Sequence, residues 1–250
     1  MEYPQKKKSI TEKIIRLFSH KLHTIEKRQS HIFVLLFVLL LMQIGQFFYV
    51  QYTLSRKTDE PKEKIVYRNN KVLFLGDSIT EQYDLENYFH NDDYINGGRG
   101  GNATGDILEQ MKERVYDYNP AKIFLMIGTN DGMTSDLEDN QAIKNIEKII
   151  SDIQVTLPNT KLYVESILPV NDSDDEKIDH DMVRDRSNDN IKEMNQQIQD
   201  LCKEYQVTYI NLYDKLIDDE GNLKLEYTRE GLHMSDEGYQ VITKELKKFL

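Results

Sequence analysis

Short, continuous runs of apolar residues alternate along most of the chain with longer segments in which apolar residues recur at helical spacing. The candidate strands lie over residues 71–75, 93–96, 122–127, 161–166 and 207–211, and the run that ends at residue 75 is typical of a strand buried on both faces. The helical patterns lie between them, over residues 104–118, 140–156 and 187–205, with a last one from about residue 235. Alternation of this kind predicts an α/β fold in which a parallel sheet of about five strands carries helices on both faces.

One apolar stretch, over residues 32–50, is longer than the others. As a helix rising about 1.5 Å per residue, it would match the hydrocarbon core of a bilayer, which is roughly 30 Å thick. The residues at its end lack the small-x-small pattern of a signal-peptide cleavage site, so the stretch is predicted to be a retained transmembrane helix. A helix buried in a protein core is the alternative interpretation.

This helix would divide the chain into a basic tail (1–31), a membrane anchor (32–50), a polar linker (51–70) and a folded domain (71–250). Eight Lys/Arg precede the anchor and five lie in residues 51–68. The positive-inside rule therefore favours a cytoplasmic N-terminus. The predicted location is the cell membrane, crossed once, with the folded domain outside the cell.

Charge is distributed unevenly along the chain. Residues 1–68 carry thirteen Lys/Arg and six Asp/Glu, whereas residues 69–250 carry nineteen Lys/Arg and thirty-seven Asp/Glu. An acidic domain is repelled by phosphate backbones, which argues against a nucleic-acid partner. Cys202 is the single cysteine, so an intrachain disulfide is excluded, and the helical spacing of its apolar neighbours predicts a buried core position.

Candidate chemistry begins where the apolar run from Val72 ends in Gly76 and is followed by Ser78. Open α/β sheets bind ligands at the carboxyl ends of their strands, so Ser78 is expected to lie at such a site. A serine hydroxyl alone is a poor nucleophile. It needs a general base, a group that orients the base, and donors for the oxyanion that forms.

Three later stretches supply candidates for these groups. Asn96–Gly98 follows a predicted strand and offers a backbone N–H, and Gly128–Asp131 follows another strand and offers the side-chain amide of Asn130. Glu230–His233 offers a base with a carboxylate three residues before it. Each of these stretches alone more often has a structural role, so the prediction of a catalytic site rests on their combination.

In this order, the four pieces closely resemble the motifs of the SGNH (GDSL-type) hydrolase family, whose serine, glycine, asparagine and histidine fall on Ser78, Gly98, Asn130 and His233. The resemblance covers residues 71–250. It implies the flavodoxin-like strand order in a three-layer sandwich. It also implies an oxyanion hole formed by the backbone N–H groups of Ser78 and Gly98 and the side chain of Asn130.

The chain departs from the family pattern at one position. The family usually has an aspartate three residues before the histidine, where this chain has Glu230. Either Glu230 orients the imidazole in place of the aspartate, or its longer side chain misses the ring and a backbone carbonyl orients His233. The first interpretation is favoured because an ionised acceptor forms the stronger hydrogen bond with an imidazolium.

Chemistry and resemblance together predict a membrane-anchored serine esterase with the catalytic residues Ser78, His233 and Glu230. No metal or organic cofactor is required. The expected substrates are small acyl esters, acetyl above all, on carbohydrate or a surface glycan. The alternatives are a lysophospholipase or thioesterase, an O-acyltransferase using the same triad, and a non-catalytic glycan-binding module.

Two further patterns in the sequence are candidates for binding other ligands. Gly98–Ala103 fits the dinucleotide-binding pattern G-x-G-x-x-G/A, but no acidic residue ends the strand that follows, so cofactor binding is not expected. The segment Asn171–Asp189 is dense in carboxylates, but their spacing does not follow that of a calcium-binding loop. A solvated flap beside the active site is the favoured interpretation of that segment.

Overall fold

The computed structural model describes residues 70–131 and 141–250, together with the helical positions 12–13, 15–19, 21, 39, 41–47 and 49. The chain divides into two units, Met1–Tyr67 and Arg68–Leu250. Every candidate site residue lies in the second unit.

A parallel sheet forms the centre of the second unit. Its strands are β1 (Val72–Gly76), β2 (Tyr94–Gly98), β3 (Lys122–Met126), β4 (Lys161–Glu165) and β5 (Thr208–Ile210). They are arranged in the order β2-β1-β3-β4-β5, and each neighbouring pair is parallel. This is the flavodoxin-like order. The predicted α/β fold with a five-stranded parallel sheet is therefore confirmed.

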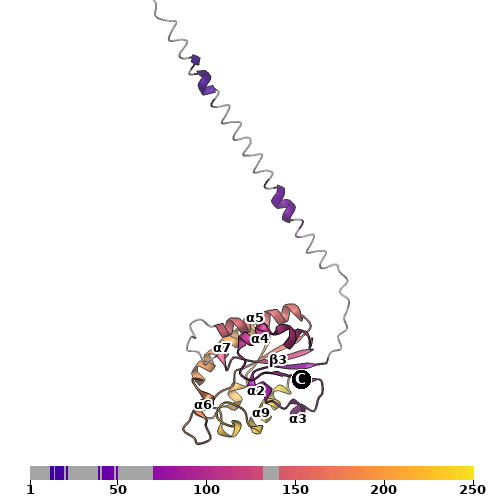
Figure 1. Cartoon of the computed structure of the whole chain (residues 1–250), viewed down its shortest axis with the longest axis vertical. Helices are drawn as coiled ribbons and strands as arrows, with labels where there is room; N and C mark the ends of the chain where they lie inside the picture. The colour runs from indigo at the N-terminus through magenta and orange to yellow at the C-terminus, as the bar shows by residue number, and fades with distance from the viewer. Residues whose placement is uncertain are drawn as a thin grey trace, which may run out of the picture. The chain divides into compact units, whose positions relative to one another are not determined.

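Helices cover both faces of the sheet because side chains alternate along each strand. Leu73 and Leu75 of β1 belong to one buried cluster, which includes apolar side chains from α4 (Thr104–Glu109), α5 (Gln141–Thr156) and α7 (Asn188–Glu204). Phe74 belongs to a second cluster, which includes side chains from α2 (Ser78–Glu81), α3 (Leu85–Phe89) and α9 (Asp236–Leu246). The two groups of helices lie on opposite sides of the sheet (Figure 1).

The longer helices begin close to where the sequence predicts, because serine caps fix their starts. Ser187 accepts a hydrogen bond from the Asn190 N–H at the start of α7, and Ser235 accepts one from the Gly238 N–H at the start of α9. The helix predicted over 104–118 is instead divided. α4 ends at Glu109, and a π-helical turn, η1 (Lys112–Tyr116), follows it.

Shorter elements complete the unit. They are α6 (His180–Val183), α8 (Tyr213–Leu216) and the 3₁₀ turn η3 (Leu225–Tyr227). Within the predicted flap 171–189, Ile178, Val183 and Arg186 are buried. This segment is therefore packed against the domain through these side chains, whereas its acidic residues are mostly exposed.

The prediction of a transmembrane helix over residues 32–50 is wrong. Among the residues that the structure describes, no helix is long and apolar enough to cross a membrane. The helical positions described within that range include Gln43, Gly45 and Gln46, whereas a spanning helix needs about 20 consecutive, predominantly apolar residues. The predicted single-pass location in the cell membrane, with an external domain, is corrected for the same reason. The rest of 32–50 and residues 51–69 of the predicted linker lie outside the described residues.

Candidate active site

Ser78 lies at the carboxyl end of β1, as the first residue of α2. The chain turns sharply here because Gly76 has no side chain. A Cβ atom at that position would overlap Thr80 Oγ1 and the carbonyl oxygen of Met126. The side chain of Asp77 then accepts a hydrogen bond from the Ile79 N–H at 2.9 Å and caps the short helix. The end of β1, the turn at Gly76 and the cap by Asp77 together place Ser78 at the carboxyl edge of the sheet.

His233 and Glu230 form a line of hydrogen bonds with Ser78. The His233 Nε2 atom lies 3.0 Å from Ser78 Oγ, and its Nδ1 atom lies 2.5 Å from Glu230 Oε1. The His233 and Glu230 side chains are 11% and 20% exposed, so the line is largely shielded from water. Such an arrangement can remove the proton from a serine hydroxyl while the carboxylate stabilises the imidazolium that results.

A tight turn holds the imidazole and the carboxylate together. Glu230 Oε1 also accepts the backbone N–H of His233 at 2.9 Å. Thr228 braces the turn, because its hydroxyl donates to the His233 carbonyl at 2.9 Å and accepts the Gly231 N–H at 2.7 Å. Gly231 has a φ of +105°, a left-handed conformation that favours glycine.

Asn130 follows β3 and is held on both sides of its amide. Its Nδ2 atom donates to the Asn102 carbonyl at 2.9 Å, and its Oδ1 atom accepts from Arg186 Nη2 at 2.9 Å. An amide NH₂ carries two hydrogens, and the second one donates to no residue in the described parts of the chain. Asn130 can therefore offer one hydrogen-bond donor to a ligand.

Gly98 is placed differently from the other predicted site residues. Its N–H donates to Asn96 Oδ1 at 2.9 Å, and a Cβ atom would overlap the backbone of Thr80 and Glu81 in α2. The structure thus brings Ser78, His233 and Glu230 together, whereas the Gly98 N–H is already donated to a neighbouring side chain. Gly100 also lies near the serine, since its ideal Cβ position lies 3.9 Å from Ser78 Cβ.

A model of the GDSL-like Lipase/Acylhydrolase family matches residues 74–241, from β1 to α9. The chain belongs to this family. This family comprises lipases and acylhydrolases.

Two curated relatives of this chain are N-acylneuraminate cytidylyltransferases. The Escherichia coli protein is 27% identical over 184 residues, covering 72% of this chain and 40% of that protein. The Streptococcus agalactiae protein is 26% identical over 215 residues, covering 83% of this chain and 46% of that protein. The chain thus spans less than half the length of these relatives.

Solved structures share the fold of this chain. A Streptococcus pneumonia protein, described provisionally as a platelet activating factor, is 40% identical and superposes with a TM-score of 0.67 over 74% of this chain and 86% of that one. A GDSL-like lipase from Bacteroides thetaiotaomicron is 22% identical and superposes with a TM-score of 0.64 over 80% of this chain and 96% of that one, which shows a shared fold.

Two aspartates with raised pKa values lie beside the candidate site. Burial raises the pKa of Asp77 to about 7, opposed by the hydrogen bond from the Ile79 backbone and by the positive charge of Arg186. Burial also raises the pKa of Asp131, which accepts hydrogen bonds from the N–H and hydroxyl of Thr104 and so attaches the end of β3 to α4. Both aspartates stabilise the loops that carry Ser78 and Asn130.

Arg186 was not among the predicted site residues, because an arginine in an acidic loop is usually exposed to solvent. Its side chain is buried and contacts Asn130 directly. Gly100 and Gly101 were likewise not predicted to lie near Ser78. The repeated glycine pair, 97–98 and 100–101, was the available signal.

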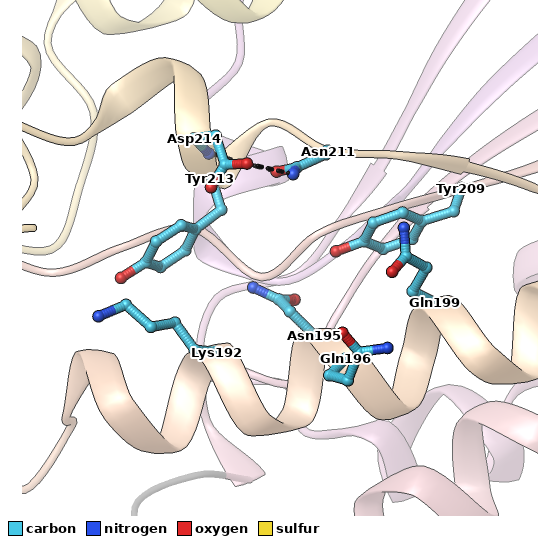
Figure 2. A pocket seen from close by; sticks show the side chains of 8 residues that line it. All are labelled: Lys192, Asn195, Gln196, Gln199, Tyr209, Asn211, Tyr213 and Asp214. Atoms are coloured by element: carbon cyan, nitrogen blue, oxygen red, sulfur yellow. Dashed lines mark hydrogen bonds between the residues drawn. The ribbon is translucent and has the colours of Figure 1, made fainter.

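A separate pocket of about 210 Å³ lies between α7 and the segment that follows β5 (Figure 2). Polar side chains line it, including Gln196 and Gln199 of α7 and Asn211 beyond β5. None of Ser78, Glu230 and His233 contributes to its lining. This pocket is therefore separate from the candidate active site at Ser78.

Proposed function

We propose that the protein is a serine esterase that removes small acyl groups, above all acetyl, from a carbohydrate. The single observation that carries this proposal is the line of hydrogen bonds from Ser78 Oγ through the His233 imidazole to Glu230 Oε1. The N-acylneuraminate cytidylyltransferase relatives support a sugar as the alcohol part of the substrate, because their name refers to a sugar derivative.

The reaction proceeds in two halves. His233 Nε2 takes the proton from Ser78 Oγ as this oxygen attacks the ester carbonyl carbon, and then returns the proton to the leaving alcohol. Water, deprotonated by the same imidazole, next attacks the acyl-enzyme and releases the acid and the free serine. Glu230 remains ionised throughout. It holds the proton on Nδ1, so that Nε2 is free to act as the base.

The oxyanion is stabilised by donors close to Ser78. The Ser78 N–H is at the first position of α2, where a helix leaves its N–H groups without intrahelical partners. The free hydrogen of Asn130 Nδ2 is the second donor. We assign the third to the backbone N–H of Gly101 in place of Gly98, because Gly101 lies between Gly100, which approaches Ser78, and Asn102, which contacts Asn130.

A second candidate substrate is an acetylated phospholipid. The 40% identical Streptococcus pneumonia protein is described in terms of platelet activating factor, and that compound is a phospholipid with an acetyl ester. Both candidates share the acetyl group and differ in the alcohol that leaves.

The test is a substrate panel. Wild-type protein and Ser78→Ala are assayed on p-nitrophenyl acetate, longer p-nitrophenyl esters, acetylated polysaccharide, platelet activating factor and lysophospholipid. We expect the highest kcat/KM among natural substrates on acetylated polysaccharide, and loss of all turnover in Ser78→Ala. Preferential turnover of platelet activating factor would favour the second candidate. Wild-type activity in Ser78→Ala would remove Ser78 as the nucleophile.

A further inference from the structure

Arg186 is a buried cation that no step of the proposed reaction uses. It lies between α6 and the Ser187 cap of α7 and is only 7% exposed. A charged group is buried at a high cost unless its hydrogen bonds are satisfied. Here every guanidinium nitrogen has an acceptor, which indicates a specific position for this side chain.

The guanidinium joins two segments of the chain. Its Nη1 atom donates to the carbonyls of Met182 and Val183, both at 3.0 Å, in its own segment. Its Nε atom donates to the Thr129 carbonyl at 3.0 Å, and Nη2 donates to Asn130 Oδ1 at 2.9 Å. Arg186 therefore binds both the backbone before Asn130 and the amide of Asn130 itself.

Two bonds set which way the Asn130 amide faces: Nδ2 donates to the Asn102 carbonyl, and Oδ1 accepts from the Arg186 guanidinium. The oxygen and nitrogen of an asparagine side chain are nearly equal in size, so packing alone distinguishes the two orientations poorly. In the inverted orientation Oδ1, not Nδ2, would face the oxyanion and repel it. A cationic donor on Oδ1 excludes that orientation and draws electron density from the amide, which strengthens its remaining N–H as a donor.

The segment that carries Arg186 is itself attached to the His233 turn. The Asn171 N–H donates to the Gly231 carbonyl at 2.8 Å, and the Asp179 N–H donates to the Glu230 carbonyl at 2.9 Å. One segment thus contacts the turn that holds the base and, through Arg186, the residue that would bind the oxyanion. Its attachment at both places fixes the guanidinium relative to the serine.

We infer that Arg186 is a positioning residue for ester hydrolysis, which acts by holding the Asn130 amide with Nδ2 toward the oxyanion. The inference rests on the proposed function, since it requires Asn130 to be an oxyanion donor. Its effect belongs to the transition state, because the oxyanion exists only there.

The test is a double-mutant cycle on the full chain with p-nitrophenyl acetate. Asn130→Ala should lower kcat by about 10²–10³-fold, and Arg186→Met by about 10–10²-fold, with little change of KM in either. The double variant should be no slower than Asn130→Ala alone, because Arg186 acts through the amide that is already absent. Independent, multiplying effects of the two substitutions would overturn the inference.

Two further variants separate positioning from folding. Arg186→Lys keeps the cation but cannot match the planar fork of donors, so we expect it to retain more kcat than Arg186→Met, again with no additional effect in the Asn130→Ala background. Asn195→Ala is the control, because Asn195 is also 7% exposed and binds backbone groups, those of Ile167. It should lower the melting temperature, leave kcat unchanged and show no coupling to Asn130.

The outcomes distinguish this inference from the proposed function. Normal kcat in Asn130→Ala would remove Asn130 from the oxyanion hole and overturn the role of Arg186 with it, while the Ser78→Ala result would still test the esterase. A slow Asn130→Ala without coupling to either Arg186 variant would overturn the role of Arg186 alone.

Discussion

At position 230 a glutamate stands where the family usually has an aspartate, and the geometry explains how the longer side chain reaches the ring. Glu230 Oε1 binds two groups of the same residue, the backbone N–H of His233 at 2.9 Å and its ring Nδ1 at 2.5 Å. The additional methylene is accommodated because the side chain folds back over its own turn. The first of the two interpretations, an orienting carboxylate, is thus the one with matching geometry.

The first prediction concerns the charge of this carboxylate. Glu230→Gln keeps the shape of the side chain but loses the ionised acceptor, so kcat/KM on a small ester should fall at least about tenfold, or roughly 1.4 kcal/mol. Glu230→Asp should keep most of the activity. The measurement is kcat/KM for both variants, with circular dichroism to establish folding. Near-normal turnover by a folded Glu230→Gln would leave a dyad of Ser78 and His233.

At the scale of elements, the close approach of β2 and α2 determines where Ser78 sits. Gly98 ends β2, and any Cβ atom there would overlap the backbone of Thr80 and Glu81, which a side-chain rotation cannot relieve. The backbone of the helix that begins with Ser78 therefore packs directly against Gly98. This explains a glycine at position 98 without any role for its N–H in catalysis.

The second prediction follows from that contact. Gly98→Ala should destabilise the protein by about 1–3 kcal/mol, as overpacked cores do, and should lower kcat because α2 must shift with its serine. Gly105→Ala is the matched control in α4, where the nearest atom to a Cβ would be Asn145 Nδ2 at 3.9 Å. It should preserve kcat and keep or raise the melting temperature. The melting temperature and kcat are measured for both variants. Equal changes in Gly98→Ala and Gly105→Ala would contradict the proposed overlap of a Cβ atom at position 98 with α2.

The sheet could be predicted from the sequence because β1, β3 and β4 contain continuous apolar runs. Each of the five strands begins and ends within about two residues of its predicted range. The division of the predicted helix 104–118 into α4 and η1 could not be predicted, because a π-helical turn changes the spacing of apolar residues only slightly. In the site, Ser78, Glu230 and His233 meet as motif spacing predicted. The occupied N–H of Gly98 depends on the rotamer of Asn96, and the burial of Arg186 depends on tertiary packing, so neither is visible in a linear pattern.

At the scale of the whole molecule, the candidate site and both buried clusters belong to the unit Arg68–Leu250. A third prediction is that a chain starting at Arg68 folds and keeps kcat/KM within about twofold, because a domain with its own core folds independently. Urea unfolding and the p-nitrophenyl acetate assay are compared with those of the full chain, with Ser78→Ala in the short chain as the background control. Loss of the cooperative transition on truncation would show that the preceding residues stabilise this unit.

Buried carboxyl groups make the stability of this molecule depend on pH in an unusual direction. Glu165 ends β4 and is 5% exposed, and burial raises its pKa to about 8 from an ordinary value of 4.5. Burial likewise raises the pKa of Asp77 from 3.8 to about 7. Each group holds its proton in the folded state at pH values where the unfolded chain has released it. The contribution of these two groups to the free energy of unfolding therefore falls as pH rises through these intervals.

The fourth prediction assigns part of this loss to Glu165. Its contribution is fully present below pH 4.5 and is lost as pH approaches 8, a change on the order of 5 kcal/mol at most. Glu165→Gln replaces a protonated acid by an amide that does not titrate, so it should match the wild type at pH 4.5 and exceed its stability at pH 8.5. Urea unfolding at both pH values gives the two free energies. Glu193→Gln, on the exposed side of α7, removes the same formal charge and should change neither. A Glu165→Gln protein whose stability falls with pH as steeply as that of the wild type would exclude Glu165 as the group responsible, and would leave Asp77 to account for the slope.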